Sequence, residues 1–266
     1  MSWINEASKD SKPATNEPKE VAKKVSNPFI SVENNKGKRG LKVAVFGKSG
    51  TGKTRLGYTF PEPVYFIDTE MGATPIANDF KDKQIFITEI WEKSDDEVME
   101  RDEVACFEKI KEAIEYLYKN PPQQGTIVID SATDLWSMCQ SYCKVKLFKL
   151  SPTDRLKYQF DWGKITNVYK QLITKLLTMP CNVLLCGRSK EIYDGPNPTG
   201  DYGAHLQKDT EYFVDVLIQM KKLFSKTNPK FLSQIEKCRM NGRIMGKEIE
   251  NLTYEKLKEL IEGGGK

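Results

Sequence analysis

The chain has a single histidine, His205, among its 266 residues. Histidine-based catalytic triads and metal sites built from several histidines are therefore excluded. The six cysteines form no C-x-x-C pair, and several lie in apolar runs, where cysteine packs as a small hydrophobic side chain. We therefore expect no zinc site, no disulfide framework and a reducing compartment.

Long apolar runs are also lacking, because no stretch approaches the roughly 20 residues that span a bilayer. The polar residues 1–6 contain no apolar core of a signal peptide. We expect a cytoplasmic protein, in a host cytoplasm if the chain is viral, with no membrane partner. The charges nearly balance, with 41 Lys and Arg against 37 Asp and Glu. Any nucleic-acid site must therefore be local.

One stretch carries a complete phosphate-binding motif. The apolar run 43–46 ends at a glycine, from which the spacing G-x-x-x-x-G-K-T is complete. Such glycines let backbone N–H groups turn inward around phosphate oxygens, and the following helix directs its positive end at them. Lys53 is expected to reach the β and γ phosphates of ATP, and the Thr54 hydroxyl to bind Mg²⁺. The predicted nucleotide-binding residues are Gly47, Lys48, Ser49, Gly50, Thr51, Gly52, Lys53 and Thr54.

Two carboxylates follow the next predicted strand, at residues 64–67. In an open α/β sheet, ligands bind at the carboxyl ends of the strands. Glu70 is therefore a candidate catalytic residue that polarises the water attacking the γ phosphate. The alternative is that Asp68 and Glu70 only cap the turn at Gly72.

Another apolar strand, at residues 126–131, also ends in a carboxylate. It follows a third predicted strand at 84–87 and an amphipathic helix at 103–118. This is the Walker B pattern, in which the Asp130 carboxylate holds Mg²⁺ across from the phosphate loop.

The second half of the chain begins with two predicted helices, at 134–150 and 160–179. The connector at 149–158 is basic and partly aromatic. It could contact a nucleic-acid backbone, although a solvated loop is the commoner explanation. A buried strand follows at 182–186, and the polar residues after it would face the γ phosphate. We expect one of these residues, Arg188 or Ser189, to sense ATP.

Residues 191–210 are expected to form a long glycine-rich loop that contains His205, either functional or disordered. Paired strands at 213–220 and 230–239 follow. Lys237 and Arg239 alternate along the second of these strands, so both project from one face. A last helix, at 254–261, has Thr253 as its N-cap.

The composition divides the chain into three regions. Residues 1–40 form a flexible basic tail, in which segment 28–32 is apolar and could dock on the chain's own core or on a neighbouring subunit. Residues 41–250 form the predicted ATPase core. Residues 251–266 form a C-terminal helix and a flexible tail.

The order of these parts resembles the RecA-like recombinase core, and within it the phage-type ATPases linked to single-strand annealing and recombination. The matching segments are the phosphate loop, 66–70, 127–131 and 237–239. The resemblance implies an α/β fold: a RecA-like P-loop core with a mostly parallel sheet flanked by helices, a C-terminal β-hairpin and a terminal helix. It further implies ATP and Mg²⁺ as cofactors.

The resemblance also implies residue roles and partners. Glu70 would activate water, Asp130 would bind the metal, and Lys237 with Arg239 would enter the ATP site of a neighbouring subunit. Such a contribution can be worth about three to five orders of magnitude in rate. Single-stranded DNA and further copies of the chain, in a ring or filament, would be the partners, together with single-strand-binding or other replication proteins. The DNA-binding loops would lie at 149–163 and 190–210.

Two other functions stay open. A nucleotide or nucleoside kinase could use the same phosphate loop, but such enzymes carry an arginine-rich lid, and this chain has no such segment. They also place no strand between the Walker A and Walker B strands, whereas two predicted strands intervene here. A regulatory ring ATPase, such as a helicase loader or clock-type ring, differs from a recombinase only in whether DNA is bound.

Overall fold

The structure is a computed structural model that describes residues 29, 31, 39–95, 100–224 and 228–263. The chain divides into two units, residues 1–36 and 37–266. Only Phe29 and Ser31 of the first unit are described, so the expected tail and its docking segment 28–32 otherwise lie outside the described residues. The helices and strands of the described residues belong to the second unit.

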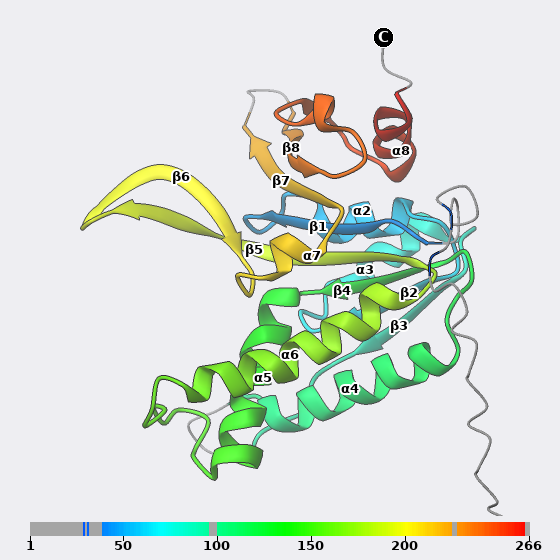
Figure 1. Cartoon of the computed structure of the whole chain (residues 1–266). Coiled ribbons are helices and arrows are strands. Elements are labelled where there is room, and N and C mark those ends of the chain that lie inside the picture. Colours follow the sequence, from blue (N-terminus) through cyan, green and yellow to red (C-terminus); the bar gives the residue numbers. More distant parts are fainter. Residues whose placement is uncertain (1–28, 30, 32–38, 96–99, 225–227, 264–266) are drawn as a thin grey trace, which may run out of the picture. The chain divides into compact units, whose positions relative to one another are not determined.

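The second unit alternates strands and helices (Figure 1). Its first half and middle run in the order β1 (Lys42–Gly47), α2 (Lys53–Thr59), β2 (Val64–Asp68), α3 (Ala73–Ala77), η1 (Asn78–Phe80), β3 (Ile85–Glu89), α4 (Glu103–Lys119), β4 (Thr126–Asp130), α5 (Ala132–Phe148) and α6 (Asp161–Thr178). The remainder comprises β5 (Asn182–Asp194), β6 (Asn197–His205), α7 (Thr210–Phe213), β7 (Val216–Leu223), β8 (Lys230–Cys238), η2 (Gly242–Ile244), β9 (Glu248–Glu250) and α8 (Tyr254–Glu262).

These strands form one sheet in the order β3-β2-β4-β5-β1-β7-β8-β9, with β6 paired to β5. The pairs from β3 to β7 are parallel, whereas β5–β6, β7–β8 and β8–β9 are antiparallel. The expected α/β class, with a mostly parallel sheet and a C-terminal hairpin, is confirmed. In the sheet, β5 lies between β1 and β4. The strands β2 and β3, which lie between β1 and β4 in the sequence, are on the far side of β4.

Helices cover both faces of the sheet because the buried strands are apolar on both sides. Along β1, Ala44 and Phe46 join the hydrophobic cluster under α4, α5 and α6. The alternate residues Val43 and Val45 join the cluster under α2, α3 and α8. Figure 1 shows α4, α5 and α6 together on one side of the sheet.

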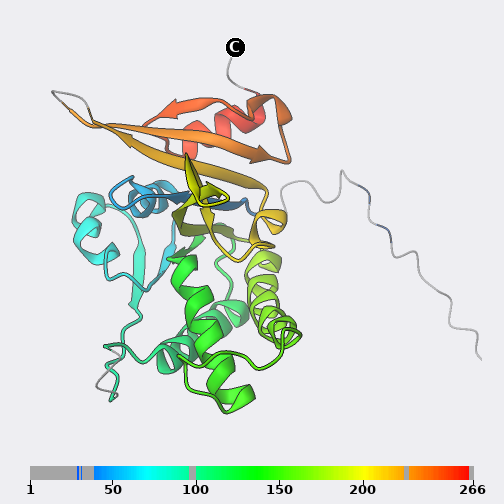
Figure 2. The same ribbon diagram turned by 90° about the vertical axis from the view of Figure 1, so that its left-hand side faces the viewer.

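The C-terminal segment is part of the same packed body. The Thr253 side chain caps α8 as expected, accepting a hydrogen bond from the Lys256 backbone N–H. Leu257 of α8 is fully buried in the core cluster. Figure 2 shows α8 lying beside the strands β7, β8 and β9.

The expected loop at 191–210 is wrong, because most of it is a β-hairpin. β5 continues past the predicted end at Cys186 as far as Asp194 and pairs with β6. Gly195 and Gly200 have φ of 59° and 81°, and the register shifts between Glu191 and Tyr193. These glycines, which in the sequence suggest a loop, therefore lie in the turn and in an irregular strand of the hairpin. The only histidine ends a strand instead of lying in a loop.

Two further predictions need correction at the C-terminal side. The predicted strand at 213–220 begins later, at Val216, because residues 210–213 form the short helix α7. The short elements α3, η1, η2 and β9 were not expected from the sequence, since each has only three to five residues. The remaining helices and strands match their predicted positions to within a few residues, the usual uncertainty of element ends.

Candidate nucleotide site

The phosphate loop connects the carboxyl end of β1 to α2, and its glycines meet specific requirements. Gly50 and Gly52 have φ of 71° and 93°, a region that favours glycine. A Cβ atom on Gly47 would lie 2.4 Å from the Met220 carbonyl oxygen, so only glycine lets β1 approach β7 there. The predicted motif therefore has the backbone geometry that its spacing indicates.

Lys53 is 8% exposed and turns back into this loop. Its Nζ donates to the carbonyl oxygens of Gly47, at 3.1 Å, and Lys48, at 3.0 Å. The ammonium group is therefore held over the cradle where phosphate oxygens would lie.

Thr54 and Asp130 meet across the site, as the two motifs predict. The Thr54 hydroxyl donates to Asp130 Oδ2 at 2.6 Å. The other carboxylate oxygen, Oδ1, is buried and has no hydrogen-bond partner among the described residues. Burial raises the pKa of Asp130 from 3.8 to about 6. An unpaired buried carboxylate oxygen beside a hydroxyl fits the oxygen ligand set that Mg²⁺ prefers.

The two carboxylates after β2 have different surroundings. Asp68 is 1% exposed, and its oxygens accept hydrogen bonds from the backbone N–H groups of Glu70, at 3.0 Å, and Ala73, at 2.7 Å. Asp68 therefore caps the turn, as the alternative interpretation stated. The Glu70 side chain is instead directed into the site, where it meets an arginine.

That arginine is Arg188, the central residue of β5, which is level with Gly47 at the end of β1. Its Nε donates to Glu70 Oε1 at 3.0 Å, and its NH2 lies 2.9 Å from the same oxygen. The same NH2 lies 3.1 Å from Asp134. Arg188 therefore bridges two carboxylates beside the phosphate loop, and these neighbouring negative charges raise its pKa against the effect of burial.

Several site residues were missed in the sequence. Asp134, in the first turn of α5, accepts a hydrogen bond from the Thr69 hydroxyl at 3.1 Å. Arg101 approaches Asp134 at 3.8 Å and lies over the ring of Trp91. Asp134 follows Asp130 by four positions, which is a usable signal, whereas nothing in the sequence singles out Trp91 or Arg101.

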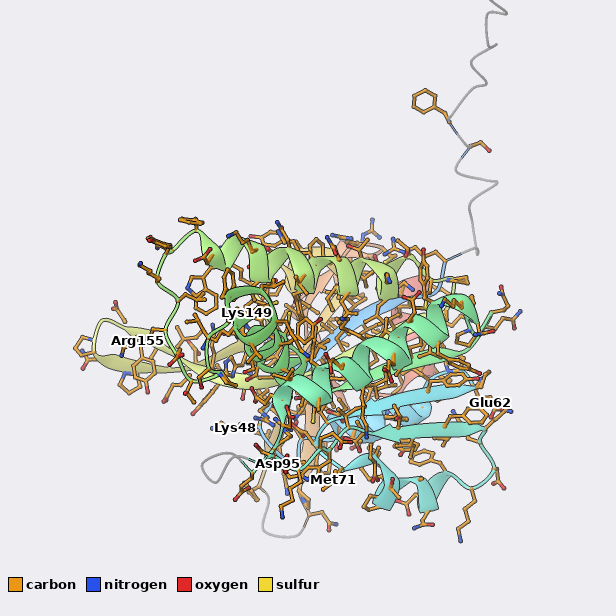
Figure 3. All side chains as sticks on the ribbon, turned by 90° about the horizontal axis from the view of Figure 1, so that it is seen from below. Lys48, Glu62, Met71, Asp95, Lys149 and Arg155 are labelled. Atoms are coloured by element: carbon orange, nitrogen blue, oxygen red, sulfur yellow. The ribbon has the colours of Figure 1, made fainter. Side chains whose placement is uncertain are left out.

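These residues surround a cavity of about 1010 Å³ at the carboxyl edge of the sheet. The Lys48 ammonium lies 3.8 Å from the centre of the Tyr202 ring of the hairpin. Figure 3 labels Lys48 and Met71, which both border the cavity. Its lining comprises Gly47, Lys48, Ser49, Gly50, Gly52, Lys53, Thr54, Arg55, Thr69, Glu70, Met71, Gly72, Ile76, Trp91, Arg101, Asp134, Arg188, Ser189, Tyr202 and Phe231.

Lys237 and Arg239 are not among the residues that line this cavity. Lys237 pairs in register with Leu217 of β7, which is level with Ala44 near the amino end of β1. The Lys237 ammonium donates to the carbonyl oxygens of Glu211 and Val214, and the Arg239 guanidinium donates to those of Tyr212 and Phe213. Both side chains therefore lie at the amino ends of the parallel strands. The phosphate loop lies at the carboxyl ends of the same strands.

The α5–α6 connection carries exposed aromatic rings between basic side chains. Tyr158 and Phe160 are 50% and 66% exposed, and their rings stack with centroids 5.3 Å apart and planes at 12°. The ammonium groups of Lys157 and Lys164 lie 5.3 Å from the Tyr158 and Phe160 rings, respectively. Figure 3 labels Lys149, where this connection begins.

Fold and site together define a P-loop NTPase: a mostly parallel sheet, a phosphate loop after a central strand, and a hydroxyl and carboxylate that fit Mg²⁺. A family model described as an AAA domain matches residues 39–241. The chain belongs to this AAA domain family, which implies NTPase activity with a nucleotide and Mg²⁺. No curated protein matches the chain.

Among solved structures, the chain is similar to a KaiC-like protein, PH0186, from the hyperthermophilic archaeon Pyrococcus horikoshii OT3. The two are 19% identical, with a TM-score of 0.47, and the match covers 80% of this chain and 85% of that one.

Two kinds of feature are absent from the described residues. None of their helices is long and apolar enough to cross a membrane. Within the same part of the chain, no group of three or more histidine, cysteine or acidic residues is placed to hold a metal ion. The Thr54–Asp130 pair differs from such a group because nucleotide phosphates and water complete the coordination of Mg²⁺ in P-loop sites.

Proposed function

We propose that the chain is an ATP-hydrolysing recombinase or single-strand annealing protein of the RecA-like type. It assembles with copies of itself, binds single-stranded DNA and hydrolyses ATP at subunit interfaces. The observation that carries the ATPase part is the meeting of Lys53, Thr54 and Glu70 around one cavity, with Asp130 hydrogen-bonded to Thr54 directly behind its wall.

In hydrolysis, each of these side chains has a distinct task. Lys53 leaves the carbonyl oxygens of its own loop and donates to β and γ phosphate oxygens. Thr54 and Asp130 would hold Mg²⁺, which would neutralise charge on the phosphates. Glu70 orients the attacking water and accepts its proton while the γ phosphoryl group separates from ADP, giving ADP and phosphate.

Arg188 would act as the sensor of the γ phosphate. It approaches the site already paired with Glu70 and Asp134. A triphosphate competes with these carboxylates for the guanidinium, because arginine binds phosphate oxygens in the same bidentate manner. Arg188 drawn toward the phosphate would leave Glu70 free to act on water.

The α5–α6 connection supports the DNA part of the proposal. Together with the adjoining ends of the two helices, as residues 144–164, the connection contains six basic and two acidic side chains, a net charge of +4, equal to that of the whole chain. Stacked, exposed rings beside ammonium groups suit unpaired bases and their phosphates. A duplex hides its base faces, so this surface favours single strands.

The test is steady-state ATPase activity and DNA binding at low salt, where phosphate contacts are strongest. We expect single-stranded DNA to stimulate hydrolysis, and Tyr158→Ala to weaken single-strand binding roughly tenfold through loss of one base stack. Tyr116→Ala is the matched control, since Tyr116 is similarly exposed but lies on α4.

Two results would contradict the proposal. An ATPase rate indifferent to DNA at every salt concentration and strand length would remove the recombinase function and favour the regulatory ATPase. Equal weakening by Tyr158→Ala and Tyr116→Ala would show that bases do not stack on the α5–α6 connection.

A further inference from the structure

A second, smaller cavity of about 160 Å³ adjoins the phosphate loop. It lies between α2, the strands β7 and β8, and the segment that leads into α8. Gly52, Arg55 and Phe231 line both cavities, so the two meet at these residues. The smaller cavity is below the roughly 300 Å³ at which pockets for whole drug-sized ligands begin. It can hold one part of a ligand whose remainder lies in the larger cavity.

The direction of a bound nucleotide follows from the phosphate loop. Lys53 reaches the β and γ phosphates, and the backbone at the start of α2 holds the α phosphate. The ribose and base must then leave past the first turn of α2, where Arg55 lies. This is also the place where the two cavities meet.

The wall of the smaller cavity is fastened to α2. The Asn251 backbone N–H donates to the Phe231 carbonyl oxygen at 2.9 Å, which joins the start of β8 to the segment before α8. The Tyr254 backbone N–H donates to the Thr59 hydroxyl of α2 at 2.9 Å. Phe231 is therefore presented at a fixed position opposite α2.

The other side of the opening is also fixed. Arg55 donates to Asp79 at 2.6 Å, and its guanidinium lies 5.2 Å from the centre of the Phe80 ring. These contacts hold the Arg55 side chain toward η1. Arg55 and Phe231 both line the opening that joins the two cavities, so a ring that enters there lies beside both side chains.

We propose that the base of the nucleotide binds at this junction, with its face against Phe231 and its edge toward Asn251. The proposal rests on the ATPase function proposed above and adds the residues that recognise the base. It also assigns a ligand class: the two fused rings of a purine bury more area against Phe231 than the single ring of a pyrimidine. Purine nucleoside triphosphates are therefore the preferred ligands.

The test compares the affinity of the full chain for Mg²⁺–ATP with its affinity for inorganic tripolyphosphate, which has the phosphates but no base. Phe231→Ala is expected to weaken ATP binding roughly 5- to 100-fold, as for loss of one base stack. Its affinity for tripolyphosphate should stay within about twofold of the unaltered chain. Phe224→Ala is the matched control, because Phe224 is exposed and lines neither cavity.

The unaltered chain gives an independent measurement that needs no variant. ATP and GTP should bind more tightly than CTP and UTP, and all four more tightly than tripolyphosphate. Equal affinities for ATP and tripolyphosphate, or an unchanged ATP affinity in Phe231→Ala, would overturn the base site while leaving the ATPase proposal intact. If the chain bound neither ATP nor tripolyphosphate, the proposed function itself would fail, and the base site with it.

Discussion

At the scale of single residues, the site holds its charged groups in arrangements that a nucleotide must change. Lys53 donates to carbonyl oxygens of its own loop, Arg188 pairs with Glu70, and Thr54 donates to Asp130. Each of these contacts occupies a group that the proposed chemistry needs. Binding of ATP and Mg²⁺ therefore exchanges internal contacts for ligand contacts, so little new order is required.

Asp130 makes this exchange dependent on pH. Its pKa in the folded chain is raised to about 6, chiefly by burial, so the folded chain binds a proton more readily than the unfolded chain. The free energy of unfolding without Mg²⁺ should fall as pH rises from about 4 to 6 and stay lower above. Asp130→Asn removes the free-energy cost of burying the ionised carboxylate. It should therefore stabilise the metal-free chain at pH 7 by about 3 kcal/mol.

Urea unfolding of the metal-free chain between pH 4.5 and 7.5 checks this prediction. Burial also raises the pKa of Asp68, so the pH dependence should shrink in Asp130→Asn without vanishing. Mg²⁺ binding should show the opposite trend and strengthen toward pH 6, because only the carboxylate binds the metal. Asp201→Asn, on the exposed hairpin, is the control. Parallel unfolding curves for Asp130→Asn and the unaltered chain would contradict the assignment.

At the scale of elements, the phosphate loop depends on how closely β1 approaches β7. The end of β1 lies against the Met220 backbone, with no room for a side chain at Gly47. The loop position is therefore set by strand packing as well as by the glycines within the loop itself. Hydrogen bonds of Lys53 to the same turn fix it further.

Gly47→Ala should consequently displace the loop. The new Cβ would meet the Met220 carbonyl oxygen at 2.4 Å, and backbone atoms cannot move aside as a side chain can. We expect loss of measurable ATP binding and a destabilisation of about 1–3 kcal/mol, typical of overpacking. Titration with ATP and thermal unfolding measure the two effects.

Gly72→Ala provides the comparison, because Gly72 has φ of −99° and no atom of the described residues lies within 4 Å of its added Cβ. It also borders the large cavity, so it controls for a methyl group added near the ligand. ATP binding by Gly47→Ala at the level of Gly72→Ala would show that the loop tolerates the shift.

The elements also show what the sequence could and could not predict. The phosphate loop and the Thr54–Asp130 meeting were predictable, since each rests on a local motif at the end of an apolar strand. The β5–β6 hairpin was not, because its glycines and Pro198 interrupt the alternation of a strand. Asp134 and Arg101 belong to separate elements that meet only at the carboxyl edge of the sheet, so no spacing in the sequence joins them.

At the scale of the whole molecule, the two ends of the parallel strands carry different functional groups. The phosphate loop, Glu70 and Arg188 lie at the carboxyl ends, whereas Lys237 and Arg239 lie at the amino ends. A chain cannot bring its own Lys237 to its own phosphates across the sheet. Stacking of copies in a head-to-tail manner would place the basic edge of one copy against the ATP site of the next.

This arrangement makes a prediction about mixtures of inactive variants. Glu70→Gln loses the group that activates water but keeps Arg239, and Arg239→Ala keeps Glu70 but lacks the basic group offered to the neighbour. Each variant alone should be at least a hundredfold slower than the unaltered chain in DNA-stimulated hydrolysis. In an equimolar mixture, some interfaces combine an intact Glu70 from one copy with an intact Arg239 from the other.

Activity should therefore recover in the mixture to a sizeable fraction of that of the unaltered chain, as measured by phosphate release at saturating single-stranded DNA. Lys53→Ala provides the control. A mixture of Lys53→Ala with Arg239→Ala should recover activity, because the Lys53→Ala copies contribute an intact Arg239. A mixture of Lys53→Ala with Glu70→Gln should stay inactive, because Lys53 and Glu70 of one ATP site must come from the same chain. If the mixture of Glu70→Gln with Arg239→Ala stayed inactive, Arg239 would not act in the ATP site of a neighbouring copy. Its hydrogen bonds to the Tyr212 and Phe213 carbonyl oxygens would then have a structural role within its own chain.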